Sequence, residues 1–402
     1  MMIYAPIRVL LFALAYWIAI MKYIRSKVFK SMPQQSAKKQ TITMLIKYLF
    51  FLLLIPLSAF TQSRETAINS IINQHNTKGF SGVVLVADNG HALYHKAFRF
   101  REFASGIPLQ ASDIFEMASI SKTFTAMIIM MLKEKSKLNY DDLVEKYQDI
   151  PYKGITIRHL LTHTGGLPDY QEIMDKHWDK TKVAGNEDIL EYLNKYAPPK
   201  LFEPGSKYEY SNTGYVLLAS IAEQASGKDF IELCRKWIFK PLKMSSTNIR
   251  SLKAKRGTKN FAIGHIYVPQ KQQYVRADSF PSSDYTIWLG NRKGPGRVSS
   301  TAADLLKWDQ ALYTNKLVNQ STLLEAFAPY KLSNDSLTNY GFGWMLRTHP
   351  QSGKIVYHTG DNPGYENSFV RYTDTNKTII ILSNNAYDNL EAMIQQIENK
   401  FQ

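Results

Sequence analysis

The sequence contains very little cysteine. Cys234 is the single cysteine among 402 residues, which excludes an intramolecular disulfide and a zinc site built on several thiolates. A lone thiol in an amphipathic segment is typically buried and unreactive, and we expect the same here. Tandem repeats and low-complexity tracts are also absent, whereas 45% of the residues are hydrophobic. A chain of this length and composition is expected to fold around a large core.

Acidic residues are missing from the first 60 positions, which hold eight of the 49 lysines and arginines. Subtracting these eight charges reduces the formal net charge from +15 to +7 for the rest of the chain. The remaining basic residues are interspersed with acids, which is typical of a solvated surface. We therefore expect no nucleic-acid partner.

A hydrophobic run long enough to span a bilayer is missing as well. Residues 9–21 and 48–60 are apolar, but both runs are shorter than the roughly 20 residues that a membrane helix needs. The second run has the features of a secretory signal, with Met44 as an internal start, Lys47 as its basic residue and small residues before Gln62. No cysteine stands directly after this run, which argues against a lipid anchor.

These features predict three regions. Residues 1–43 would be an upstream extension of the reading frame, residues 44–61 a signal peptide, and residues 62–402 the mature domain. The alternative is that residues 9–21 form a real membrane segment. In that case the protein would be tethered through its N-terminus, and membrane contact would depend on that segment being retained.

Local patterns in the mature domain indicate an antiparallel sheet between two terminal helices. Two strand-like runs flank Asp88-Asn89-Gly90, and Asn-Gly between such runs predicts a hairpin. The segments KIVYHTG, ENSFVRYTD and NKTIIILSN predict three more strands, before a final helix at about 390–400. The sheet would use residues of about 62–118 and 340–402, interrupted by a mostly helical insertion at about 140–312.

The pattern Ser-x-x-Lys at Ser119 and Lys122 places two side chains one helical turn apart, so the amine can reach and activate the hydroxyl. The pattern alone is unspecific, because Ser36 and Lys39 also match it. Ser119, however, opens the apolar segment 119–135, which predicts a buried helix. The free N–H groups and the dipole at such a helix start stabilise negative charge on an attacked carbonyl.

Two other patterns each occur more than once. Tyr-x-Asn begins at positions 192, 210, 313, 365 and 387, and His-Thr-Gly begins at His163 and His358. His163 follows helical-looking sequence and leads into a Gly-Gly-Leu-Pro loop, so we interpret it as structural. His358 follows a strand-like run, and an edge strand beside a nucleophile can hold an extended substrate.

Taken in order, SISK at 119, YSN at 210 and HTG at 358 resemble the three motifs of serine β-lactamase-related proteins, and of the class C β-lactamase and D,D-peptidase branch in particular. ITIRHLLTHTGGLPDY, RVSSTAADLLKW and HTGDNPGY are similar to that branch too, and the resemblance covers residues of about 64–400. It implies an α/β (α+β) serine β-lactamase/D,D-peptidase-like fold. In that fold an antiparallel sheet is flanked by helices, and the site lies between the sheet and an all-helical subdomain.

The resemblance also implies a role for each motif residue. Ser119 would form the acyl-enzyme, Lys122 would help to remove its proton, and Tyr210 would act as general acid and base toward the leaving group. Substrate binding would fall to Asn212, His358, Thr359 and Gly360. The backbone N–H groups of Ser119 and Asp361 would form the oxyanion hole. No metal or other cofactor is needed for this chemistry.

His358 departs from the pattern of many class C β-lactamases, which carry lysine there, and histidine is familiar among peptidases and esterases of the branch. An imidazole, with an ordinary pKa of about 6.5, attracts a carboxylate more weakly at neutral pH than an ammonium does. We expect the adjacent Asp361 to favour the protonated ring. His159 and His163 lie four residues apart, but without the glutamate of a zinc motif they predict no metal site.

The sequence therefore predicts an exported serine hydrolase, periplasmic or at the cell surface, that acts through an acyl-enzyme on a peptide, amide or ester. D-alanyl cell-wall peptides are the candidate substrates, with peptidoglycan and β-lactams as further candidate partners. One alternative is a weak class C-like β-lactamase. Another is a catalytically silent relative that binds an envelope partner, although a binding module has no need for both Ser119 and Lys122 at one helix start.

Overall fold

The computed structural model describes residues 64–401. The predicted signal peptide, the upstream extension and Ser36 lie outside these residues. The described chain begins with a helix over residues 64–77 and ends with α13 (Leu390–Phe401). This agrees with the prediction of a sheet between two terminal helices.

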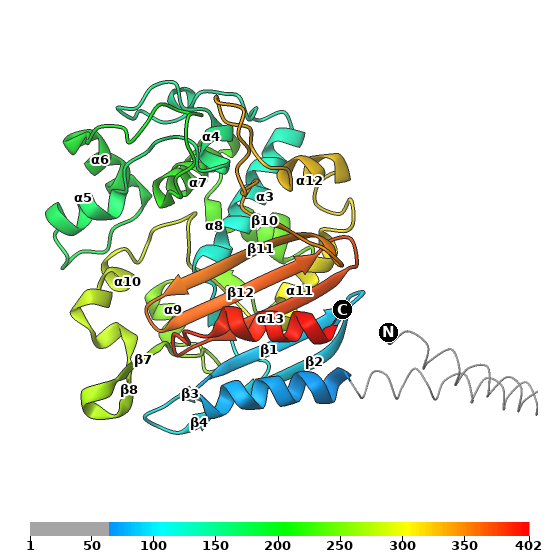
Figure 1. Ribbon diagram of the computed structural model, residues 1–402. Helices are drawn as coiled ribbons and strands as arrows, with labels where there is room; N and C mark the ends of the chain where they lie inside the picture. Colours follow the sequence, from blue (N-terminus) through cyan, green and yellow to red (C-terminus); the bar gives the residue numbers. More distant parts are fainter. Residues whose placement is uncertain (1–63, 402) are drawn as a thin grey trace, which may run out of the picture. The chain divides into compact units, whose positions relative to one another are not determined.

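A six-stranded antiparallel sheet forms the centre of the described domain (Figure 1). In spatial order its strands are β10 (Met345–His349), β11 (Gly353–Asn362), β12 (Tyr365–Tyr372), β13 (Lys377–Ser383), β1 (Gly82–Asp88) and β2 (His91–Phe98). The three strands predicted near the C-terminus are confirmed as β11, β12 and β13. The first and last of the long central strands pair directly, with Gly82 opposite Ser383 and Asp88 opposite Lys377.

The predicted hairpin is also confirmed. β1 and β2 are joined by Asn89 and Gly90, whose φ angles are +49° and +77°. Positive φ at both central residues is the signature of a type I′ turn, which matches the right-handed twist of paired strands. Asn and Gly are the residues that adopt this backbone most easily.

Side chains alternate between the two faces of the sheet along each strand. A hydrophobic core covers each face. Val84 and Val86 of β1 pack in one core with Ile68 of the first helix and Ile394 of α13. Figure 1 shows these two helices on the same side of the sheet. Leu85, which lies between these two valines in β1, belongs to the larger core on the opposite face.

The larger core is built around α3 (Ser121–Glu134), in which every residue from Ser121 to Leu132 is buried. α3 packs against α7 (Asn212–Ser226) and α8 (Phe230–Cys234). The other helices are α4 (Ile157–Leu161), α5 (Tyr170–His177), α6 (Asn186–Tyr196), α9 (Leu252–Arg256), α10 (Tyr285–Trp288), α11 (Ala302–Ala311) and α12 (Gln320–Ala326). The predicted buried helix is thus present, and it connects the sheet to the helical region.

Short strands complete the architecture. They are β3 (Phe100–Glu102), β4 (Ile107–Pro108), β5 (Phe115–Glu116), β6 (Asn248–Ile249), β7 (His265–Val268), β8 (Gln273–Arg276) and β9 (Val298–Ser300). β5, β9 and β6 form a small sheet, and β7 pairs with β8. The segment 140–312, expected to be mostly helical, therefore also contains four short strands.

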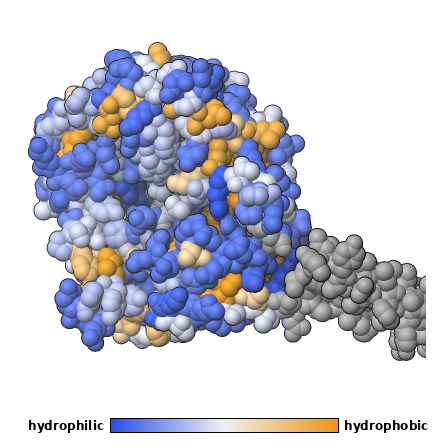
Figure 2. Space-filling model, in the orientation of Figure 1, coloured by the Kyte–Doolittle hydropathy of each residue, from blue (hydrophilic) through white to orange (hydrophobic). Residues whose placement is uncertain are grey.

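The surface in Figure 2 is predominantly hydrophilic, with hydrophobic residues scattered in small areas. Among the helices that the structure describes, none combines the length and the apolar character needed to cross a bilayer. Cys234 is fully buried at the end of α8.

Candidate active site

Ser119 lies in a 3₁₀ turn, Ala118–Ile120, directly before α3. Ala118 has a φ of +46°, a backbone conformation that residues with a β-carbon seldom adopt and that is often found at functional sites. The N–H of Met117 anchors the turn by donating to the carbonyl of Val298 over 2.8 Å. Ala118 and Ile120 are buried, whereas Ser119 is partly exposed. The turn therefore presents one hydroxyl from an otherwise buried segment.

The Lys122 ammonium connects three segments of the site. Its Nζ donates to Ser119 Oγ over 3.0 Å, to Asn212 Oδ1 over 2.8 Å and to the Pro295 carbonyl over 3.0 Å. The side chain is fully buried. Burial, and then the nearby Arg292 cation, hold the pKa of Lys122 well below its ordinary value. A lysine in this state loses its proton easily and can accept one from the serine hydroxyl.

Tyr210 also lies beside Lys122. Lys122 Nζ lies 4.7 Å from the centre of the Tyr210 ring. Burial raises the pKa of Tyr210, and a hydrogen bond with Ser119 opposes the rise. The phenol therefore keeps its proton at neutral pH, which is the state that can protonate a leaving group.

Asn212 is held in place by the start of α7. Ser211 caps this helix, its Oγ accepting from the N–H of Gly214 over 3.3 Å. Thr213 Oγ1 donates to the Pro168 carbonyl over 2.7 Å, which ties the helix start to the loop before α5. Because both neighbours are fixed, the Asn212 amide oxygen stays directed at Lys122.

β11 passes very close to the nucleophile turn at Gly360. A β-carbon at this position would lie 2.2 Å from the carbonyl oxygen of Met117, so only glycine allows the approach. Asn367 of β12 secures the contact, since its Nδ2 donates to the carbonyls of Glu116 and Gly360 over 2.9 and 3.2 Å. Thr359 and Asp361 flank Gly360 and are exposed. β11 is not the edge strand suggested by the sequence, because β10 pairs with it as far as Tyr357. Beyond Tyr357 its strand partner is β12 alone, and this part lies beside the nucleophile turn.

His358 lies in β11, directly before Thr359. Its side chain is fully buried, with Nε2 2.9 Å from the Tyr340 hydroxyl and Nδ1 2.6 Å from the Thr359 carbonyl. Side chains alternate along a strand, so His358 shares the inward face of β11 with Gly360, and Thr359 points outward. The imidazole contacts Tyr340, and its contact with a substrate stays a prediction.

The expected charge on His358 is corrected. Burial, together with the Lys122 cation, lowers the pKa of His358 to about 3. The ring is therefore neutral at physiological pH. Asp361, which we expected to favour protonation, is not among the groups that act on the ring.

His163, interpreted from the sequence as a structural loop residue, lies within this constellation. Its ring centre is 4.3 Å from that of Tyr210 and 4.6 Å from that of Tyr340. Its Nδ1 accepts from the backbone N–H of Ser211 over 3.0 Å. Burial, and then Lys122 and His358, hold the pKa of His163 well below its ordinary value. No local signal identified this residue, because its contacts come from segments far apart in sequence.

Two other residues have structural positions. Trp344 is 1% exposed and packs against Phe327 and Phe369, which places it in the core. His159 takes part in the capping box at the start of α4 through its contacts with Thr156. Residues 64–401 contain no cluster of His, Cys, Asp or Glu arranged to hold a metal ion.

The comparisons with known proteins agree with this geometry. The beta-lactamase family profile matches residues 68–398, so the chain belongs to that family, whose members are serine hydrolases. Within the family the chain is similar to penicillin-binding protein 4* of Bacillus subtilis, with 41% identity over 327 residues, or 81% of this chain and 72% of that protein. The predicted fold class and enzyme class are confirmed.

Two more distant proteins are also similar. Teichoic acid D-alanine hydrolase of Staphylococcus aureus is 25% identical over 330 residues, which cover 80% of this chain and 74% of that protein. The octameric penicillin-binding protein homologue from Pyrococcus abyssi superposes with a TM-score of 0.70 at 24% identity, over 81% of this chain and 74% of that chain. The second similarity supports the fold alone.

Proposed function

We propose that this protein is an exported serine hydrolase that cleaves amide or ester bonds of D-alanyl substrates through an acyl-enzyme on Ser119. The observation that carries the proposal is the 3.0 Å hydrogen bond between Lys122 Nζ and Ser119 Oγ. It joins a buried amine with a lowered pKa to a hydroxyl at the start of a buried helix. This is the arrangement that activates a weak nucleophile.

In the acylation step, Ser119 Oγ attacks the substrate carbonyl carbon and transfers its proton to the neutral Lys122 amine. The carbonyl oxygen becomes negative and is stabilised by the N–H groups of Ser119 and Asp361. Collapse of this intermediate breaks the bond to the leaving group, which takes a proton from Tyr210. Lys122 then returns its proton toward Tyr210, whose raised pKa favours the protonated phenol.

Deacylation repeats these steps with water as the nucleophile. Water attacks the ester carbonyl and gives its proton to the same basic pair, and the Ser119 oxygen leaves and is reprotonated. Asn212 contributes by holding Lys122 in place over 2.8 Å. Thr359 is exposed beside Gly360 and is therefore available to a substrate chain.

One observation supports D-alanyl substrates, since the names of the similar proteins refer to penicillin binding and to D-alanine hydrolysis. The neutral, buried His358 supplies no cation for a substrate carboxylate. Both β-lactams and D-alanyl peptides with a free C-terminus carry such a carboxylate, so this feature favours D-alanyl esters and amides that lack it. β-Lactam hydrolysis is the second candidate function.

The test is a substrate panel measured with wild-type protein and the Ser119→Ala variant. It contains a D-alanyl-D-alanine peptide, its L-alanyl isomer, a D-alanyl ester and the β-lactam nitrocefin. The D-alanyl compounds should be hydrolysed fastest, and only by the wild type. Intact mass after exposure to a fluorophosphonate tests the alternative of a catalytically silent binder, which would show no added mass.

A further inference from the structure

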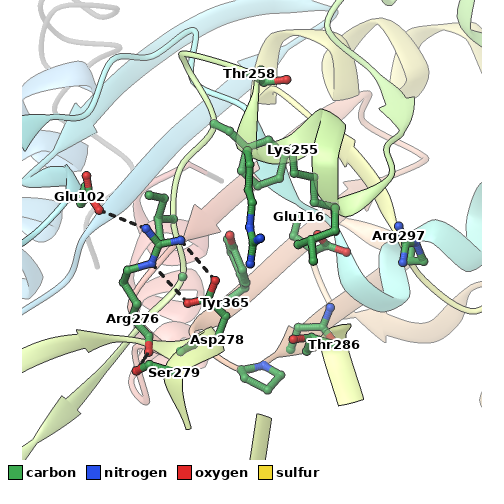
Figure 3. Close-up of a pocket in the computed structure, with 18 of the residues that line it drawn as sticks. Glu102, Glu116, Lys255, Thr258, Arg276, Asp278, Ser279, Thr286, Arg297 and Tyr365 are labelled. Atoms are coloured by element: carbon green, nitrogen blue, oxygen red, sulfur yellow. Dashed lines mark hydrogen bonds and ion pairs between the residues drawn. The ribbon is translucent and has the colours of Figure 1, made fainter. Parts of the chain in front are cut away.

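Figure 3 shows a cavity of about 710 Å³. Seven of its lining residues are arginine or lysine, and three are aspartate or glutamate. Its lining includes Glu116, which precedes Ser119 by three residues, and Arg292. A β-carbon at Gly296 would lie 3.6 Å from Arg292 Nη2 and 3.9 Å from the Ala118 carbonyl, so both groups border this glycine.

Most charges in this cavity already have partners. Arg276 pairs with Asp278 and Glu102, and Figure 3 shows this group at one end of the cavity. At the other end, which contains Arg297, Glu116 forms an ion pair with Lys255. The opposite charges within each pair neutralise one another, so no ligand is needed to explain them.

Arg292 and Arg297 differ from the other cations of the cavity. They are only 8% and 6% exposed, and no carboxylate within residues 64–401 lies at ion-pair distance from either one. Arg292 donates to the Tyr170 hydroxyl over 2.6 Å, and its Nε has no partner in this part of the chain. Arg297 donates to the Arg250 carbonyl over 2.6 Å. Buried charges are normally paired, because an unpaired one loses its hydration without compensation.

The backbone at Arg297 adds a second observation. Its φ is +77°, a conformation that a long side chain adopts only when its surroundings impose it. Such outliers gather at ligand-binding positions. Here the strained residue directs a guanidinium into the lining of the cavity.

We propose that Arg292 and Arg297 form an anion subsite that binds a carboxylate on the acyl portion of the substrate. This inference rests on the proposed hydrolase function. Ser119, Tyr210 and Thr359 do not line the cavity. Arg292 is its connection to the site, because this cation acts on Lys122 and its Nη2 borders Gly296 together with the Ala118 carbonyl. A carboxylate would reach it from the acyl portion, which stays bonded to Ser119. Two guanidinium groups suit a planar carboxylate because each presents paired donors.

The test uses matched p-nitrophenyl esters of dicarboxylic acids of increasing chain length. Each acid ester is compared with the neutral ester in which a carboxamide replaces the free carboxylate. Wild-type kcat/KM should favour the acid by roughly tenfold or more at the best length, the effect of a charge-assisted contact. Arg292→Gln, which can still donate to Tyr170, and Arg297→Gly, which suits a positive φ, should each reduce this ratio toward one.

Arg276→Gln is the matched control, because this guanidinium lines the same cavity but has carboxylate partners. It should keep the preference for the acid. Folding of each variant is checked by thermal melting and by labelling of Ser119 with an uncharged fluorophosphonate. Equal loss of preference in Arg276→Gln and Arg297→Gly would overturn the assignment to the buried pair.

The outcomes also separate this inference from the proposed function. If hydrolysis requires Ser119 but the wild type shows no preference for the acid at any chain length, the anion subsite alone is wrong. If both esters are hydrolysed equally well by Ser119→Ala, the proposed function itself is wrong.

Discussion

The rings of His163 and Tyr210 pack against each other, with centres 4.3 Å apart and planes inclined by 37°. The same imidazole accepts the backbone N–H of Ser211 over 3.0 Å. Ser211 lies between Tyr210 and Asn212, so one side chain contacts the proposed acid/base and holds the backbone that follows it. His163 is therefore a positioning residue, and its own φ of +58° shows that the loop is fixed in an unusual conformation.

We expect His163→Ala to lower kcat by about tenfold or more, since a small displacement of a proton donor has a large effect on rate. His163→Asn should recover part of the loss, because asparagine tolerates a positive φ and can still accept the Ser211 N–H. The measurement is kcat and KM for a neutral ester in both variants. A loss confined to KM, or identical losses in the two variants, would contradict the positioning role.

The two His-Thr-Gly copies illustrate which features of the site could be predicted from the sequence and which could not. Their strand or loop setting was predictable from the neighbouring residues, and the copy at His358 does lie in β11. The direction of the ring was not predictable, because strand alternation defines two faces without saying which one meets the core. The role of His163 depends on Tyr210, Tyr340 and Ser211, and only tertiary packing brings them together.

The identity of the nucleophile can be tested against a matched neighbour. Ser119→Ala should abolish covalent labelling by a fluorophosphonate, whereas Ser121→Ala should retain it. Ser121 is buried, and its Oγ accepts from the Val298 N–H over 3.0 Å. Its loss should therefore reduce the free energy of unfolding by about 1 kcal/mol. Peptide mapping of the labelled protein locates the adduct, and an adduct on any residue but Ser119 would contradict the mechanism.

Neither alanine nor arginine should be able to perform the general-base role of Lys122. Lys122→Ala should slow acylation by at least about a hundredfold through loss of general-base assistance. Lys122→Arg keeps the positive charge, but a guanidinium does not give up its proton in proteins, so it should be equally slow. The measurement is the rate of ester acylation under single-turnover conditions. An active arginine variant would show that the charge, and not the basicity, of Lys122 matters.

The lowered pKa of Lys122 adds a dependence on pH. The neutral amine is the active base, so kcat/KM for an uncharged ester should rise with pH through the pKa of this group. Because burial holds that pKa below the ordinary 10.5, the acid limb of the profile should have its midpoint below that value. The same limb should be missing from the residual activity of Lys122→Ala. A limb that persists in this variant would assign the titration to another group.

More of the fold than of the site could be predicted from the sequence. Alternation of apolar residues and the Asn89-Gly90 turn identify the central strands, because both depend on local chemistry. β10 was not predicted, because Met345–His349 is a partly exposed edge strand whose residues do not alternate between buried and exposed. The cavity at Arg292 and Arg297 was not predicted either. Glu116 is far in sequence from these two arginines, and the burial of all three exists only in the folded chain.

Export is a separate prediction that concerns residues outside the described domain. Secreted protein should begin between Phe60 and Ser63, because Lys47 and the apolar run after it have the order of a signal peptide. N-terminal sequencing of protein recovered from the periplasm or the medium measures this directly. Mature protein that still carries residues 1–43 would contradict both the signal peptide and the internal start at Met44.

The buried imidazole of His358 should make stability depend on pH in a defined window. Its pKa is lowered from 6.5 to about 3 in the folded protein, so between these values the unfolded chain binds a proton that the folded chain does not. Stability from this group is therefore complete above pH 6.5 and is lost progressively as the pH falls toward 3. His358→Gln, which can still accept from the Tyr340 hydroxyl, removes the titrating group. Its melting temperature should fall less than that of the wild type between pH 7 and pH 4.

Carboxylates also titrate in this range. The informative quantity is therefore the difference between the wild-type and His358→Gln curves of melting temperature against pH. His91→Gln provides the matched control, because it removes an exposed imidazole from the start of β2. The control should follow the wild-type curve at every pH. If His358→Gln also runs parallel to the wild type, the imidazole must be protonated as easily in the folded protein as in the unfolded chain. That result would require water to reach the ring, and it would contradict the buried, neutral state of His358.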